Sequence, residues 1–272
     1  MEHKLQEVIA IVNNKGGVGK TSTVQSLAAG ILRRNRKLRV LVIDLDPQGN
    51  LTQLCGWQNN PNVKTDQTIY DALRDAGPIP VNRAPNGVYY SASSTKLQQV
   101  EVDLYRQMQP KQVLLECFKQ PVRDQTGENE QLGKIIDTFD YVFIDCPPAL
   151  SETTYNAMAV ASGLIIPVQL ESLSISGLGN ILVEVGRVKK GLNADLEIRG
   201  ILPVMVDSRS NIVKGFLEYL KSSYKNEILK TYIRRGVKMN EAQNKLQDIF
   251  EYAPYCQPAL DYDNLVKELF FK

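Results

Sequence analysis

The sequence predicts an α/β fold: a single doubly wound, mostly parallel sheet with helices on both of its faces. Short apolar runs rich in β-branched residues alternate along the chain with segments whose apolar residues recur at the period of a helix. A glycine-rich turn joins the first run to the first helix, and two later runs end in aspartate. Sheets of this class often reach 272 residues as one unit, so we expect one domain over residues 1–272.

The composition excludes several classes of protein. Hydrophobic residues make up 43% of the chain, charged residues 23%, and the formal net charge is +2, which argues against disorder and a uniformly basic nucleic-acid coat. The four cysteines form no C-x-x-C pair, which disfavours zinc, an iron–sulfur cluster and a disulfide framework. The only histidine, His3, lies at the terminus, so catalysis has to use carboxylates, lysines and metal. Because neither a leader nor a long apolar run occurs, we expect a cytoplasmic protein without a membrane contact.

The glycine-rich turn is predicted to bind phosphate. It lies between a strand expected over Val8–Val12 and a helix expected over Thr23–Arg34. Its glycines let the backbone wrap around an anion, and its N–H groups and the helix N-terminus supply positive potential there. Lys20 is placed to reach the β- and γ-phosphates of a nucleotide, and the Thr21 hydroxyl is placed to ligate Mg²⁺. The loop residues expected to bind ATP are Lys15, Gly16, Gly17, Val18, Gly19, Lys20, Thr21 and Ser22.

The loop departs from the common P-loop pattern G-x-x-x-x-G-K-[ST], which requires glycine where this chain has Asn14. It matches a variant, K-G-G-x-G-K-[ST], with a second lysine, Lys15, at the front of the loop. This variant resembles the deviant Walker A box of the ParA/MinD group of P-loop ATPases. In that group the first lysine reaches across a dimer interface to the partner's nucleotide. The resemblance therefore implies catalytic roles for both Lys15 and Lys20.

A second strand is expected over Leu38–Asp44, and its carboxyl end carries two aspartates, Asp44 and Asp46. Ligands of doubly wound sheets bind at that edge, so both should lie beside the phosphate loop if the first two strands are near neighbours. The alternative interpretation of Asp44 or Asp46 is that the aspartate only begins a turn. The run DLDPQGN resembles the switch I segment of the ParA family, which implies that Asp46 positions the attacking water. Asp44 is a candidate metal ligand.

A third strand is expected where Phe139–Asp145 again ends in aspartate. Asp145 is placed as in a Walker B strand, where it would hold a water molecule on Mg²⁺. The run FDYVFIDCPP resembles the Walker B and switch II segment of the ParA family. The neighbouring Cys146 has no nearby histidine in the sequence, so we expect a buried small residue rather than a nucleophile.

The remaining elements are expected to be irregular over about 52–138 and to alternate regularly after that. In the first region we expect helices over Thr68–Leu73 and Val113–Phe118 and a strand over Gly87–Ser91. Beyond it the expected helices are Thr153–Ala161, Ser174–Lys189, Ile212–Tyr224, Glu241–Phe250 and Tyr262–Phe271, and the expected strands are Leu164–Val168, Ile198–Val206 and the short Ile228–Ile233.

The resemblance to the ParA/Soj-type partition ATPases covers almost the whole chain, with two departures. Ser22 replaces a threonine of the family's loop, and Arg234 stands where many relatives have proline, which leaves the geometry beside the adenine open. The resemblance implies a switch that uses ATP and Mg²⁺, forms an ATP-dependent homodimer and binds DNA non-specifically. It also implies a ParB-like activating partner protein.

Basic residues are concentrated in one segment. Residues 209–245 hold nine basic and three acidic side chains, a net charge of +6, so the remainder of the chain carries −4. Clustered cations without a base-reading motif suit non-specific binding to the DNA backbone, and a solvated basic face is the alternative. With the resemblance, this segment implies association with the nucleoid. The candidate DNA contacts are Arg209, Lys214, Arg234, Arg235 and Lys238.

Other functions of the same ATPase core are considered as alternatives. A MinD-like positioning ATPase of membrane surfaces would need a basic amphipathic helix after the fold is complete, and none is expected here. A metabolic reductase or metal-insertion ATPase would need paired cysteines. No helix-turn-helix domain is expected before Val8, which favours a short-form partition protein. The sequence does not identify the cargo, which could be a chromosome, a plasmid, a mobile element or a protein assembly.

Overall fold

The computed structural model describes residues 5–56, 67–126, 132–207 and 209–271, so His3 lies outside the described residues. The described residues form an eight-stranded sheet in the order β5-β3-β4-β2-β6-β1-β7-β8. Strands β3 and β4 are antiparallel and the other neighbouring strands are parallel, which confirms the predicted fold class. The strands are β1 Glu7–Ile11, β2 Val40–Asp44, β3 Pro80–Arg83, β4 Tyr89–Ser91, β5 Arg123–Asp124, β6 Tyr141–Asp145, β7 Gly163–Gln169 and β8 Glu197–Val204.

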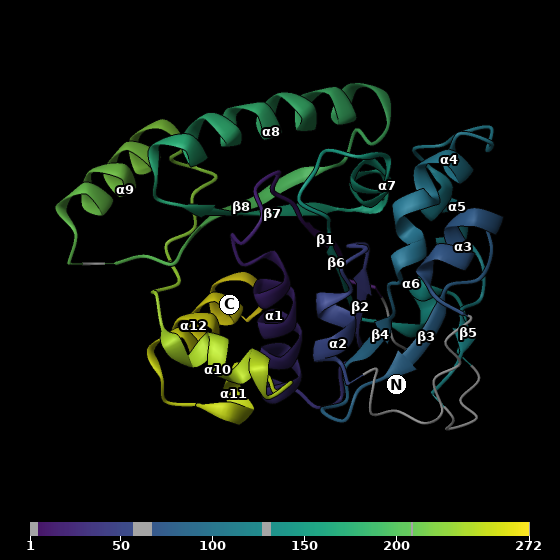
Figure 1. Cartoon of the computed structure of the whole chain (residues 1–272), viewed down its shortest axis with the longest axis horizontal. Coiled ribbons are helices and arrows are strands. Elements are labelled where there is room, and N and C mark those ends of the chain that lie inside the picture. The colour runs from purple at the N-terminus through teal and green to yellow at the C-terminus, as the bar shows by residue number, and fades with distance from the viewer. Residues whose placement is uncertain (1–4, 57–66, 127–131, 208, 272) are drawn as a thin grey trace.

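Helices cover both faces of the sheet (Figure 1). Strand β1 shows why, because Val8 and Ala10 point into one apolar cluster while Ile9 and Ile11 point into the other. Figure 1 shows α1, α10, α11 and α12 grouped together. The helices are α1 Lys20–Arg34, α2 Asn50–Leu54, α3 Ile69–Asp75, the 3₁₀ helix η2 Thr95–Gln99, α4 Val100–Leu104, α5 Val113–Phe118, α6 Ile135–Thr138, α7 Glu152–Val160, α8 Ser172–Gly191, α9 Asn211–Ser223, α10 Val237–Asn244, α11 Ile249–Tyr252 and α12 Gln257–Phe270.

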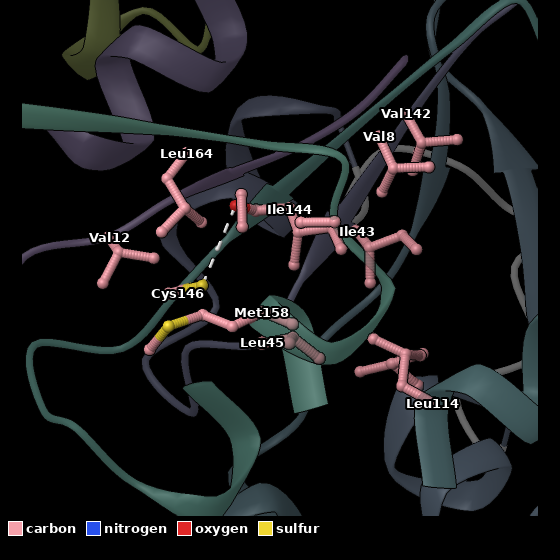
Figure 2. Close-up of a cluster of buried hydrophobic side chains, with 14 of the residues drawn as sticks. Val8, Val12, Ile43, Leu45, Leu114, Val142, Ile144, Cys146, Met158 and Leu164 are labelled. Carbon is pink, nitrogen blue, oxygen red and sulfur yellow. Dashed lines mark hydrogen bonds between the residues drawn. The ribbon is translucent and has the colours of Figure 1, made fainter. Parts of the chain in front are cut away.

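The core on the face of α5 and α7 contains Cys146 (Figure 2). The side chain is fully buried, and its sulfur lies 3.9 Å from the carbonyl oxygen of Ile144. Burial raises the pKa of the Cys146 thiol, so the reactive thiolate is disfavoured. This burial matches the expectation of a small core residue.

Strand β6 lies between β1 and β2, so the first two strands are not direct neighbours. Both pair with β6 in parallel, and the register places Asp145 opposite Ile11 on one side and Asp44 on the other. The carboxyl ends of these three strands therefore meet at one edge of the sheet.

Two predicted elements near the C-terminus are wrong. Residues 228–233 do not form a strand. Ile228 makes an isolated bridge to Ile201 of β8, but Pro203 of β8 has no N–H with which to continue a ladder. The single helix predicted over Glu241–Phe250 is divided into α10 and α11. Leu246 adopts the left-handed conformation at φ 54°, and the Asp248 carboxylate caps α11 by accepting from two backbone N–H groups.

Candidate functional site

The phosphate loop connects β1 to α1, and its shape depends on two glycines. Gly17 and Gly19 have φ values of 73° and 77°, in the left-handed region that other residues rarely adopt. The loop is anchored by Asn13, whose amide nitrogen donates to the Pro167 carbonyl at 2.7 Å and whose amide oxygen accepts from the Lys15 N–H at 2.9 Å. Asn13 is buried and ties the loop to β7. No sequence motif identified Asn13 as a functional residue.

Lys20, the first residue of α1, lies over the inside of the loop. Its ammonium donates to the Lys15 carbonyl oxygen at 3.1 Å, and the residue is only 6% exposed. Burial lowers the pKa of Lys20, while the negative charge of Asp145 opposes this shift. A buried cation beside a glycine-rich loop and a helix N-terminus is suited to bind a polyphosphate anion.

Thr21 and Asp145 meet at the carboxyl edge of the sheet. The Thr21 hydroxyl donates to one oxygen of Asp145 at 2.7 Å, while the other oxygen, Oδ1, is buried without a hydrogen-bond partner among the described residues. Burial and the neighbouring Asp44 charge raise the pKa of Asp145 well above its usual range. A divalent cation would give this oxygen a partner and neutralise the paired carboxyl groups. The donor set of hydroxyl and carboxylate therefore fits Mg²⁺.

Asp44 and Asp46 differ in what their carboxyl groups do. Asp44 is fully buried and accepts from the Thr52 hydroxyl at 2.7 Å, the Thr52 N–H at 2.8 Å and the Asp46 N–H at 3.1 Å. Both of its oxygens are thus engaged in holding the loop after β2, which favours a structural role over metal ligation. Asp46 lines the cavity beside the phosphate loop, and one of its oxygens accepts from the Gln48 N–H at 3.0 Å.

Lys15 is held by the end of β7 rather than by the phosphate loop. Its ammonium donates to Gln169 Oε1 at 3.0 Å and to Glu171 Oε2 at 2.9 Å. The Lys15 and Glu171 side chains are 39% and 63% exposed, and an ion pair this exposed contributes about 0–1 kcal/mol. The contact can therefore be exchanged for a stronger one at little cost.

A cavity of about 750 Å³ extends from the phosphate loop to α10. Its far wall comes from the end of β8, the segment before α10 and α10 itself. Of this wall, only Arg234 was placed near a nucleotide from the sequence. Residues on this wall are Val204, Met205, Ile233, Arg234, Arg235, Gly236, Val237, Met239, Asn240 and Gln243.

The wall is fixed to α12 by Arg234. Its guanidinium and its backbone N–H all donate to the Asp261 carboxylate, which is buried. Gly236 packs so closely that an added Cβ would lie 2.5 Å from Pro258. Arg234, the departure from the family pattern, therefore acts within the protein at this wall.

Among the other candidate DNA contacts, Arg209 and Arg235 lie in segments that are joined in the fold. The Arg235 N–H donates to the Val206 carbonyl oxygen at 3.1 Å, which joins the segment before α10 to the segment that leads to Arg209. Arg209 pairs with Asp207 at 3.2 Å and Lys238 pairs with Glu241 at 2.7 Å. The side chains of Lys214 and Arg235 are exposed.

Comparisons with known proteins identify the family. The family described as an AAA domain matches residues 6–198. The sporulation initiation inhibitor protein Soj of Bacillus subtilis is 34% identical over 264 residues, which cover 97% of this chain and 98% of Soj. The chromosome partitioning protein ParA of Myxococcus xanthus is 34% identical, over 96% of this chain and 87% of ParA. This chain belongs to the ParA/Soj family of partition ATPases. As a ParA/Soj-family protein it is an ATPase that uses ATP and Mg²⁺.

Solved structures with the same fold include one that holds a nucleotide. Cobyrinic acid a,c-diamide synthase of Mycobacterium smegmatis, with bound ADP and magnesium, is 27% identical with a TM-score of 0.76, over 97% of this chain and 93% of the synthase. The shared fold thus carries a nucleotide and Mg²⁺ in that relative. In the part of the ParA/Soj-family chain described here, no helix combines the length and apolar character needed to cross a membrane.

Replacing Asp145 by asparagine should stabilise the nucleotide-free protein by about 1–2 kcal/mol at roughly pH 8 and remove its stabilisation by Mg²⁺. Burial raises the pKa of Asp145, and it raises the pKa of Asp44 to about 6. Folding therefore favours the protonated acids, so the contribution of Asp44 and Asp145 to wild-type stability is fully present below the unfolded pKa near 4 and is lost as the pH rises through their folded pKa values.

Thermal melting without Mg²⁺ from roughly pH 4 to pH 8 measures this effect. The difference in melting temperature between the Asp145→Asn variant and the wild type should increase above about pH 4. Parallel curves for the two proteins would show that the Asp145 carboxyl is not strained in the nucleotide-free state.

Proposed function

We propose that this ATPase is an ATP-dependent dimerising switch that binds DNA non-specifically. With a ParB-like activating partner, it would partition a plasmid, chromosome or mobile element, and it would associate with the nucleoid. The relatives Soj and ParA, whose names refer to sporulation and chromosome partitioning, support this proposal. Within the chain, the support comes from the two lysines of the phosphate loop and from the basic segment beside the cavity.

The main observation behind the proposal is that Lys20 and Lys15 lie in different environments. Lys20 is buried over the loop, where it can bind the phosphates of its own subunit. Lys15 is half-exposed and held by Gln169 and Glu171, so it can turn towards the nucleotide of a second copy. In a symmetric dimer each site would then receive one lysine from each subunit.

In this proposal, one chain would supply the remaining catalytic groups of its own site. Asp46 would orient the attacking water and accept its proton, and Lys20 would hold the transferred phosphoryl group. Thr21 and Asp145 would hold Mg²⁺, which when bound supplies positive charge to the phosphate oxygens. Loss of the γ-phosphate would remove the contact that holds Lys15 in the partner's site, and the dimer would separate.

DNA binding is proposed to use the exposed cations of α9 and of the segment before α10. Lys214 and Arg235 are exposed, whereas Arg234 is engaged by Asp261. Arg209 and Lys238 each share their charge with an acidic neighbour. Lys214 and Arg235 should therefore contribute most to binding of the DNA backbone.

A Lys214→Ala, Arg235→Ala double variant tests this surface. Each lost phosphate contact should lower the slope of log affinity against log salt concentration by about 0.9, so we expect a decrease of about 2 for the pair. Fluorescence anisotropy with a labelled duplex of random sequence, in the presence of a non-hydrolysable ATP analogue, measures the slope. Lys189→Ala, at an exposed position of α8, is the matched control. An unchanged slope in the double variant would remove DNA binding from this surface.

The MinD-like alternative predicts a different partner for the ATP-bound state. Sedimentation with anionic liposomes, with and without ATP, distinguishes the two functions. ATP-dependent recovery in the liposome pellet, together with no binding to DNA, would favour the membrane function.

A further inference from the structure

The Ser22 hydroxyl is bonded to a residue far along the chain. The amide nitrogen Nε2 of Gln243 donates to Ser22 Oγ at 2.7 Å, across a separation of 221 residues. Ser22 lies in the first turn of α1, directly after Lys20 and Thr21, and Gln243 lies in α10. Both residues are half-buried and both line the cavity.

The direction of this hydrogen bond leaves the Ser22 proton available. A serine hydroxyl has one hydrogen to donate and two lone pairs that accept. Because Gln243 occupies a lone pair, the Ser22 O–H is directed to another acceptor. Among the residues that the structure describes, this is the one hydrogen bond of the Ser22 side chain.

The position of Ser22 indicates which acceptor it meets. Thr21 faces Asp145 and the metal side of the site, whereas Ser22 faces α10 on the opposite side. That side of the cavity is lined by apolar residues such as Val237 and Met239, which suit a nucleoside. Ser22 thus lies between the phosphate loop and the nucleoside side of the cavity.

We propose that Gln243 is a positioning residue for nucleotide binding, which orients the Ser22 hydroxyl so that it donates to the phosphate nearest the nucleoside. Helix α10 is fixed for this role, because Ala242 is buried and the Tyr252 hydroxyl donates to Glu241 at 2.8 Å. The amide is therefore held in place before the nucleotide arrives, which lowers the entropy cost of binding. This contact ties the wall beside the nucleoside directly to the phosphate loop.

Gln243→Met tests the proposal because it keeps the length of the side chain and removes the donor. Affinity for Mg-ADP and Mg-ATP should fall by roughly 5–10-fold, while kcat at saturating ATP should stay within about twofold, because the reacting phosphate lies at the other end of the site. Gln243→Glu should bind more weakly still, since its carboxylate would accept the Ser22 proton and repel the phosphate. Titration calorimetry with ADP and steady-state kinetics with ATP measure both effects.

A double-mutant cycle with Ser22→Ala separates this role from a general effect on α10. In the Ser22→Ala background, Gln243→Met should change the affinity by less than about twofold. Gln247→Met, the same substitution at a residue whose amide donates to Glu251, is the matched control and should leave the affinity for ADP unchanged.

Three outcomes would overturn the proposal. They are an unchanged affinity in Gln243→Met, additive effects of the two substitutions, and wild-type affinity in Gln243→Glu, which would mean that residue 243 accepts from Ser22. This role requires nucleotide binding but neither a dimer nor DNA. The ADP affinities of the wild type and the variants therefore test the positioning role, and the DNA titration separately tests the partition function.

Discussion

Replacing Lys20 by alanine is expected to lower the affinity for Mg-ATP at least about 100-fold. Lys20 is only 6% exposed, and inside the protein its ammonium meets the Lys15 carbonyl oxygen and the negative charge of Asp145. Its burial is unfavourable until an anion arrives, so much of the binding energy of the phosphates depends on this one charge.

The matched comparison for Lys20 is Lys15→Ala in the same loop. Lys15 is bonded to Gln169 and Glu171, so its loss should change nucleotide affinity by less than about threefold while hydrolysis falls strongly. Binding of a fluorescent ATP analogue to both variants, with thermal melting to verify folding, separates the two roles. Equal losses of affinity would mean that Lys15 also serves its own subunit.

Replacing Asp46 by asparagine is expected to reduce ATP hydrolysis by about 10²–10⁴-fold while ATP binding is retained. Two hydrogen bonds hold residue 46 in place. The Ser93 hydroxyl donates to the Asp46 carbonyl oxygen, and the Gln48 N–H donates to the Asp46 side chain. Asparagine can keep the second contact through its amide oxygen. It cannot accept a proton from the attacking water, so the change acts on the chemical step.

Single-turnover hydrolysis measures the effect of Asp46→Asn, and equilibrium binding of an ATP analogue provides the comparison. Asp137→Asn, at an exposed position of α6, is the control for a general effect of losing an acidic residue. Hydrolysis within about threefold of the wild-type rate would remove Asp46 from the catalytic role.

The sequence could place Thr21 and Asp145, the residues proposed for the metal side of the site, at one edge of the sheet because they lie in short contiguous motifs at strand ends. Thr21 follows the first strand and Asp145 ends another, and parallel strands bring their carboxyl ends to one edge. The position of β6 between β1 and β2 could not be predicted, since strand order depends on long-range pairing rather than on local pattern.

Apart from Arg234, which the resemblance placed beside the adenine, the wall opposite the phosphate loop was not predicted, because it is assembled from segments far apart in the sequence. Arg234 acts through Asp261 of α12, and Gln243 acts through Ser22 of α1. Each is a polar residue in a basic or polar stretch, where a surface position is the usual expectation. Only the fold shows that these side chains turn inward. The single helix predicted over 241–250 was wrong for a related reason. The periodicity of apolar residues in that segment does not reveal that Leu246 adopts the left-handed conformation.

A mixture of Lys15→Ala and Asp46→Asn proteins tests most directly whether two subunits share each active site. Each variant alone should be nearly inactive. In the proposed dimer, the site of the Lys15→Ala subunit has its own Asp46 and receives Lys15 from the Asp46→Asn subunit, so each mixed dimer has one complete site. With ATP, Mg²⁺ and DNA present, an equal mixture should therefore recover roughly a quarter of the wild-type rate per chain, since about half of the dimers are mixed. A rate no higher than the mean of the separate variants would contradict a lysine that crosses between subunits.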